Sequence, residues 1–429
     1  MTRAVEKRFG KRETAPQPRA CGSGGAKVAY ARAAEPAGTE AAPSAVRRAL
    51  FPGAGRHGAD RLAGLDILRL VAALAVVMYH FGYAGGTRGL MDTTYPAIAD
   101  IAKYGFLGVD LFFLISGFVI TASAYGRSWH QFAISRFLRL YPAHVVCMTT
   151  TAIVVALLAM RGTPVTPMQW LANLTMLSPA LGQPFMDGAY WSIVIEIVFY
   201  GWVAVMVATG VFERRLLTIL TVWLAISYVN EVMFQYRPMR FAVATEYAAM
   251  FAGGMLIQRL RAGERSPYAW ALLGFAFGLG GLHAFEVQRM FARLYADTVD
   301  VPLLLALHVA LYALFIGGLW LSRSLPSTRM VLTIGGLTYP LYLVHQQAGY
   351  ALIDALAPVL GSVQALGLAI LLALVCAYLV HRYAEPAGRR VLKTAINAAY
   401  ALWRPSQAML QPLFATPSAK PGQGLARAS

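Results

Sequence analysis

Residues 301–321 read VPLLLALHVALYALFIGGLWL and contain no Asp, Glu, Lys or Arg. A helix of this length is about 30 Å long, which matches the hydrocarbon core of a bilayer. Similar apolar runs recur along the chain and predict nine further spanning helices, near 64–84, 105–124, 141–160, 189–209, 216–234, 241–258, 268–284, 331–352 and 364–383. This pattern is typical of an all-α, polytopic integral membrane protein with about ten transmembrane helices.

The overall composition favours the same class. Of 429 residues, 58% are hydrophobic and only 13% are charged, against about 25% charged in an ordinary soluble domain. The net charge of +17 does not indicate nucleic-acid binding, because the basic residues lie in a tail and in short loops between apolar runs. We therefore expect the lipid bilayer, and no nucleic acid, as a partner. The three cysteines lack the spacing of a metal site, and we expect no metal.

The distribution of Lys and Arg predicts the topology. With the N-terminus inside, the inner loops and the C-terminal stretch hold fourteen of these residues and the outer loops seven, so both termini are predicted to be cytoplasmic. Residues 1–60 have no apolar run and are predicted to be a disordered, basic cytoplasmic tail, followed by a transmembrane domain over 61–386. Residues 387–429 form a C-terminal cytoplasmic tail. Within it, 388–403 is either an amphipathic helix on the inner leaflet or a solvated, partly helical segment, and 404–429 is expected to be disordered.

Ionisable residues inside the predicted spans indicate function, because charge is costly in a bilayer. The first span contains Arg69 and His80, and eleven residues turn a helix by about 1100°, which places both side chains on one face about 16 Å apart. Arg69 then lies near the inner surface and His80 in the outer half. Arg69 has an alternative interpretation as an arginine that reaches the interface only to solvate its charge.

Three other spans place ionisable groups near the predicted depth of His80, namely Glu196, His345 and His308. Pro340 precedes His345 and should kink its helix, which frees backbone groups that protein or water must satisfy. A lone histidine such as His308 is more often a hydrogen-bonded residue of the bundle interior. Likewise, Glu246 has an alternative interpretation as a residue that only pairs with a neighbouring Tyr or Arg.

Five blocks of sequence resemble the membrane acyltransferase-3 family. The blocks are the Arg69/His80 pair, GFLGVDLFFLISGF at 105–118, RFLRLYP at 136–142, WSIVIEIVFY at 191–200 and TYPLYLVH at 338–345. They follow the family order across about 64–390, while residues 1–60 lie outside the resemblance. Thr338 stands where many members have Ser, which keeps the hydroxyl.

The resemblance implies an O-acyltransferase, usually an O-acetyltransferase, in the cytoplasmic (inner) membrane of a bacterium. The donor would be cytoplasmic acyl-CoA, with acetyl-CoA preferred, and the acceptor a hydroxyl of an envelope polysaccharide, a lipid-linked glycan or a secreted metabolite. By the resemblance, Arg69 contacts the donor, His80 is catalytic, and Arg136 and Arg139 are basic positions at the inner face. About 45 residues follow the last predicted span, too few for the esterase-like domain of some members, so we expect action alone or with a separate glycan-assembly enzyme.

The chemistry of the residues agrees with acyl transfer. A base must deprotonate the acceptor, and histidine titrates near neutrality, so His80, with Glu196 and His345, is the predicted catalytic set. Arg69, Arg136 and Arg139 suit the phosphates of CoA. Direct transfer and a covalent acyl-histidine both stay open. The alternative function is a proton-coupled transporter or flippase of a glycan or lipid, although the halved repeat common in transporters is missing from the sequence.

Overall fold

The computed structural model describes residues 62–158, 165–326 and 328–414, and these residues form helices without any strand. All of them belong to one unit, Pro43–Ser429. The predicted disorder of 1–60 and of 415–429 falls outside the described residues. The helices are α2 (Ala63–Tyr79), η1 (His80–Ala84), α3 (Gly85–Thr87), α4 (Pro96–Ala102), η2 (Lys103–Phe106), α5 (Leu107–Ala124), α6 (Trp129–Leu157), α7 (Pro167–Asn173), η3 (Ser178–Leu181), α8 (Tyr190–Ala208), α9 (Val211–Val229), η4 (Asn230–Phe234), α10 (Arg237–Ala242), α11 (Ala248–Arg261), α12 (Pro267–Tyr295), α13 (Val301–Leu321), α14 (Arg329–Val344), α15 (Gln346–Leu360), α16 (Ser362–Leu379), η5 (Val380–Ala384) and α17 (Glu385–Phe414).

The all-α, polytopic membrane fold is confirmed. In the described part of the chain, eight helical stretches are long and apolar enough to cross a bilayer. The two other predicted spans also coincide with helices, but shorter ones: 241–258 corresponds to α11, and 331–352 is divided between α14 and α15. Helix starts follow local signals, as at α13, where the Asp300 carboxylate accepts a 2.8 Å hydrogen bond from the backbone N–H of Leu303.

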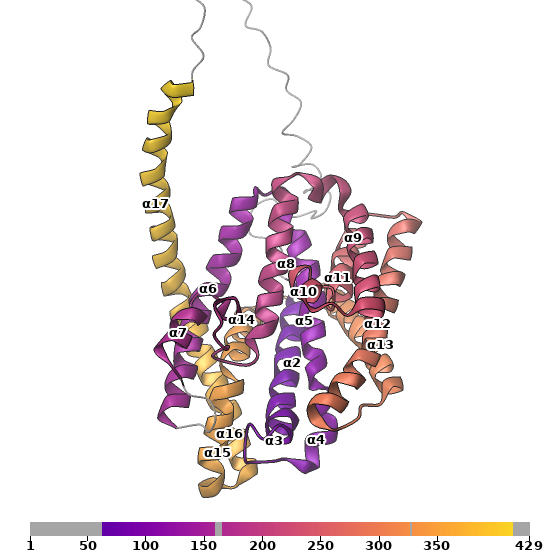
Figure 1. Ribbon diagram of the computed structural model, residues 1–429, viewed down its shortest axis with the longest axis vertical. Coiled ribbons are helices and arrows are strands. Elements are labelled where there is room, and N and C mark those ends of the chain that lie inside the picture. The colour runs from indigo at the N-terminus through magenta and orange to yellow at the C-terminus, as the bar shows by residue number, and fades with distance from the viewer. Residues whose placement is uncertain (1–61, 159–164, 327, 415–429) are drawn as a thin grey trace, which may run out of the picture. The chain divides into compact units, whose positions relative to one another are not determined.

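Helices α2 and α5 occupy the middle of the bundle (Figure 1). On one side lie α6, α7 and α14 to α16, and on the other lie α9, α12 and α13. The most extensive contact joins α5 to α11, where Gly117 faces the Phe251 carbonyl and Gly254 faces the Leu114 carbonyl. A side chain at either glycine would collide with backbone, so this pair allows the two helices to approach closely, as small residues do in membrane bundles.

Helix α6 begins earlier than the sequence predicts. It starts at Trp129 with a capping box formed by Ser128 and Gln131, and it continues through Pro142. Arg136 and Arg139 therefore lie on a helix and not in an inner loop. The prediction followed the apolar run of 141–160, which begins only after the two arginines. Pro142 is tolerated inside α6 because it is buried among neighbouring helices.

The helix around Pro340 is interrupted five residues later than expected. Pro340 lies within α14, and the break falls at His345, between α14 and α15. The His345 Nδ1 atom donates a 2.8 Å hydrogen bond to the Tyr342 carbonyl, so a side chain satisfies one of the backbone acceptors near the end of α14. Irregular backbone of this kind in a membrane bundle is tolerated where protein buries it, and it often marks a functional site.

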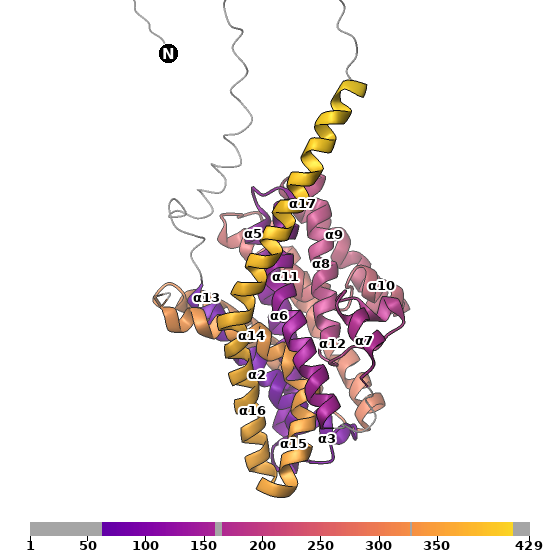
Figure 2. The ribbon, with the colours of Figure 1, turned by 90° about the vertical axis from the view of Figure 1, so that its left-hand side faces the viewer.

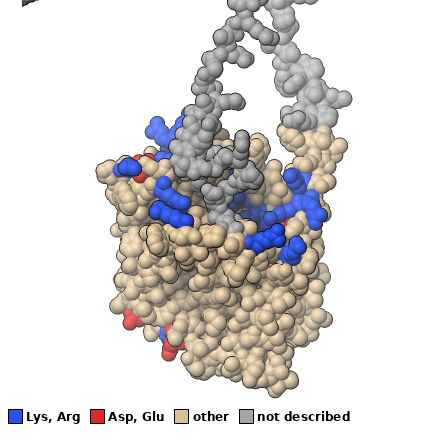
Figure 3. Space-filling view, turned by 180° about the vertical axis from the view of Figure 1, so that it is seen from behind, with Lys and Arg blue, Asp and Glu red and all other residues tan. Residues whose placement is uncertain are grey.

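Helix α17 continues the line of α16 and η5 and leaves the bundle at one end (Figure 2). It covers the predicted amphipathic segment 388–403 and extends to Phe414, so the expectation of disorder from residue 404 is wrong for its first residues. Lys and Arg side chains gather near the same end of the bundle (Figure 3). This asymmetry is the pattern that the positive-inside rule associates with a cytoplasmic face.

We expect both termini to be cytoplasmic, which reporter fusions can test. Gly361 joins α15 to α16 at the end of the bundle opposite α17, whereas Arg265 lies between α11 and α12 (Figure 1). A reporter fused after Gly361 should be extracytoplasmic, and one fused after Arg265 should be cytoplasmic. A cytoplasmic signal at Gly361 would contradict the topology.

Candidate active site

His80 begins the π-helical segment η1, at the point where α2 widens. Such widenings inside a helix frequently occur at functional sites. The His80 Nδ1 atom lies 3.1 Å from the hydroxyl of Tyr350 on α15. When Nδ1–H donates to the Tyr350 oxygen, Nε2 keeps a lone pair that can accept a proton. The contact with Tyr350 therefore orients the imidazole and is compatible with the tautomer in which Nε2 is the base.

His345 lies against His80, with ring centroids 5.1 Å apart. Its Nδ1 must carry the proton, because the Tyr342 carbonyl can only accept. The opposite atom, Nε2, is buried and has no hydrogen-bond partner among the described residues. A buried, unpaired imidazole nitrogen is costly, so this atom is suited to bind a substrate hydroxyl or a proton. The structure thus joins two predicted site residues that are far apart in sequence.

Close packing holds α15 against η1 and so keeps Tyr350 beside His80. The Phe81 ring lies directly on Gly349, where a larger residue would collide with it, and the Phe81 and Tyr350 rings are 6.2 Å apart. Both Phe81 and Tyr350 are fully buried. This rigid support is what a catalytic pair needs to keep its geometry.

Asp187, in the loop between α7 and α8, fixes the start of α15. Its fully buried carboxylate accepts hydrogen bonds of 2.9 Å from the N–H of Ala189 and 3.0 Å from the N–H of Gln347. Gln347 belongs to the first turn of α15, where free N–H groups and the helix dipole favour a carboxylate. Asp187 is therefore a positioning residue for the segment that follows His345.

Arg69 lies on α2, about 16 Å along the helix axis from His80. Its guanidinium donates a 3.1 Å hydrogen bond to Asp66, and the two side chains are 19% and 2% exposed. An arginine held by a buried carboxylate differs from one that only extends to the lipid headgroups. Its charge also interacts with Arg139 and Glu196. A basic cluster thus forms at this level of the bundle.

Glu196 on α8 belongs to this basic cluster. It accepts hydrogen bonds of 2.8 Å from Ser116 and 2.5 Å from Tyr200, and its charge interacts with that of Arg136. Within the described chain it makes no hydrogen bond to His80 or His345. The structure therefore groups Glu196 with the arginines, and its predicted part in catalysis stays a prediction.

His308 has an evident packing role. Its Nε2 atom donates a 3.0 Å hydrogen bond to the Phe277 carbonyl, and its side chain is buried between α12 and α13. Sequence reasoning did not select Tyr350, Asp187 or Ser116. No spacing signal links Tyr350 to His80, since 270 positions separate them. An Asp-Gly pair beside a predicted helix was the only available sign of Asp187.

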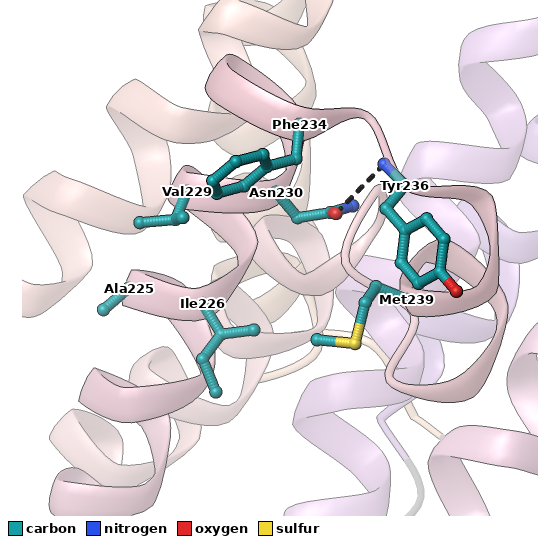
Figure 4. A pocket seen from close by; sticks show the side chains of 7 residues that line it. All are labelled: Ala225, Ile226, Val229, Asn230, Phe234, Tyr236 and Met239. Atoms are coloured by element: carbon teal, nitrogen blue, oxygen red, sulfur yellow. Dashed lines mark hydrogen bonds between the residues drawn. The ribbon is translucent and has the colours of Figure 1, made fainter.

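A pocket of about 690 Å³ opens elsewhere, between α9, η4 and α10 (Figure 4). Its lining is Ala225, Ile226, Val229, Asn230, Phe234, Tyr236 and Met239. None of the predicted site residues lines it, and its side chains are mostly apolar. The pocket therefore offers no groups for acyl transfer. In the part of the chain that the structure describes, no group of three or more His, Cys, Asp or Glu could hold a metal ion.

Comparison with known proteins assigns the described bundle to one kind of domain. A family model described as an acyltransferase domain (Acyl_transf_3) matches residues 62–382. YrhL of Bacillus subtilis, whose name assigns it provisionally to the peptidoglycan O-acetyltransferases, is 29% identical over 32% of this chain and 22% of its own length. The peptidoglycan O-acetyltransferase OatA of Listeria monocytogenes is 28% identical over 34% of this chain and 24% of its own.

A third relative, the acyltransferase MdmB of Streptomyces mycarofaciens, is 30% identical over 33% of this chain and 38% of its own length. The chain thus matches about a quarter of the first two relatives. No solved structure matches it.

Proposed function

The chain belongs to the acyltransferase family whose model matches residues 62–382, and we propose that it moves an acyl group from cytoplasmic acyl-CoA to a hydroxyl of an envelope carbohydrate. The observation that carries the proposal is the buried pair of His80 and His345, supported by Tyr350, in the same bundle as a cluster of arginines. This combination supplies a base and an anion site, which are the two requirements of the reaction.

The basic cluster is the proposed donor site. Arg69 on α2 and Arg136 and Arg139 on α6 lie near enough for their charges to interact, and an anion would relieve their repulsion. Guanidinium groups bind phosphate in a bidentate manner. Arg69 also lies on the same helix as His80. The thin pantetheine arm could then extend along α2 from the phosphates toward the histidine pair, with acetyl as the preferred acyl group.

At the histidine pair, His80 Nε2 takes the proton of the acceptor hydroxyl as the oxygen attacks the thioester carbonyl. A carbon–oxygen bond forms, the carbon–sulfur bond breaks, and the imidazolium returns the proton to the departing CoA sulfur. His345 Nε2, which lacks a partner among the described residues, accepts a hydrogen bond that orients the acceptor. A covalent acyl-histidine would use the same groups.

The acceptor is proposed to be a sugar of the cell envelope, since two relatives carry names for peptidoglycan O-acetylation. The proposed location is a bacterial inner membrane, with glycan-assembly enzymes as partners. The candidate acceptors for assay are polysaccharide hydroxyls, lipid-linked glycans and secreted metabolites.

The test is release of CoA by the purified, full-length protein in lipid nanodiscs. We expect slow release from acetyl-CoA alone and faster release, with acyl transfer detected by mass spectrometry, when a suitable acceptor is added. Longer acyl-CoA donors serve as the comparison for chain length. If no donor gives transfer to any acceptor, while proteoliposomes show proton-dependent uptake of a glycan or lipid, the transporter alternative replaces this proposal.

A further inference from the structure

A second group of polar and aromatic side chains lies outside the histidine pair and the basic cluster. Asp110 on α5 is 6% exposed, and its charge interacts with those of His283 on α12 and Glu246 before α11. No described residue forms a hydrogen bond with the Asp110 carboxylate. A buried, ionisable side chain without a hydrogen-bond donor is expensive in a membrane protein, which points to a ligand that supplies one.

Two aromatic rings border this group. The Trp191 and Tyr247 rings are 5.5 Å apart, and the Tyr247 ring is also 5.8 Å from that of His283. The Tyr247 hydroxyl lies 3.4 Å from the Glu246 carboxylate. Trp191 is 36% exposed, and Tyr247, Glu246 and His283 are partly exposed, so the group is accessible from outside the protein core.

The aromatic group adjoins the proposed catalytic histidines. Ser192, the residue after Trp191, lies 2.6 Å from the Tyr342 hydroxyl. The Tyr342 carbonyl in turn accepts a hydrogen bond from His345, and the rings of the two residues are 5.6 Å apart. The Tyr342 side chain therefore links Ser192, at the start of α8, to the His345 ring.

We propose that Trp191, Tyr247, Glu246, His283 and Asp110 form a carbohydrate-binding subsite for the acyl acceptor. The inference rests on the proposed function. The flat C–H face of a pyranose packs on an aromatic ring, while carboxylates accept hydrogen bonds from its hydroxyl groups. This chemistry differs from that of the basic cluster, which suits phosphate. The two substrates would thus bind to different groups of side chains.

The inference is tested by sugar binding without any acyl donor. Saturation-transfer NMR on the full-length protein in nanodiscs would use three probes: the N-acetylglucosamine–N-acetylmuramic acid disaccharide, N-acetylglucosamine and a neutral hexose. We expect at least one probe to bind the native protein. Trp191→Ala and Glu246→Gln should each weaken its binding about tenfold, as expected for the loss of one stacking or charged hydrogen-bond contact.

Two variants control for misfolding. Trp191→Phe keeps an aromatic ring and should retain most of the sugar binding. Trp320→Ala, at a 66% exposed position on α13, should leave the sugar binding unchanged. If none of the three sugars binds the native protein, the carbohydrate assignment is overturned. Equal binding by native protein, Trp191→Ala and Glu246→Gln would overturn the location. Sugar binding that persists in a protein without acyl transfer would refute the proposed function and not this subsite.

Discussion

Acyl transfer by the His80→Gln variant should be about 10²–10⁴-fold slower than by the native protein, which is the usual contribution of general-base catalysis. Glutamine can hydrogen-bond to the Tyr350 hydroxyl, 3.1 Å from the native Nδ1, but it cannot accept the proton of the acceptor. Expression and membrane insertion should stay near native, since a polar side chain of similar size is kept. The measurement is single-turnover transfer from acetyl-CoA to the best acceptor.

The matched control is His308→Gln, a change of the same chemistry at a histidine that already donates to the Phe277 carbonyl. Glutamine can replace that hydrogen bond, so transfer should fall by less than about tenfold. Tyr350→Phe removes the hydroxyl that orients His80 and should give an intermediate loss. Native-like transfer by His80→Gln would remove His80 from the mechanism and return the transporter to consideration.

Much of the fold could be predicted because lipid imposes a simple rule. An apolar run of the required length must form a helix to satisfy its own backbone, and 301–321 corresponds residue for residue to α13. The rule says nothing about where a helix begins outside the apolar run, so the start of α6 at Trp129 was missed. It also cannot reveal that the His345 side chain competes for a backbone carbonyl and divides one predicted span in two.

The residues of the candidate site could be predicted only where they are ionisable side chains inside a predicted span, because burying such a side chain costs free energy. His80, His345 and Glu196 attract notice because ionisable groups are rare in lipid, and the first two indeed lie together. Depth alone, however, could not separate Glu196 from the histidines, because depth does not state which face of which helix a residue shares. Tyr350 and Asp187 were missed for a different reason: each acts through one tertiary contact, and no local pattern records such a contact.

The Arg69→Lys variant should raise the Michaelis constant for acyl-CoA about 10- to 100-fold, while the rate at saturating donor changes little. Lysine keeps the positive charge beside Asp66, so the buried ion pair that now measures 3.1 Å is not left without a cation. It loses the planar pair of N–H groups that binds a phosphate in a bidentate manner. Steady-state CoA release over a range of donor concentrations, at fixed acceptor, gives the constant.

The control is Arg261→Lys, at the end of α11, where the guanidinium lies 5.8 Å from the centre of the Phe118 ring and has no predicted contact with the donor. It should leave the constant for acyl-CoA unchanged. Direct binding of desulfo-CoA, which carries the phosphates but no thioester, should weaken in Arg69→Lys by the same factor as the Michaelis constant rises. If both quantities stay at native values, Arg69 serves only to anchor α2 at the interface, and the donor site must be sought among the other arginines of the cluster.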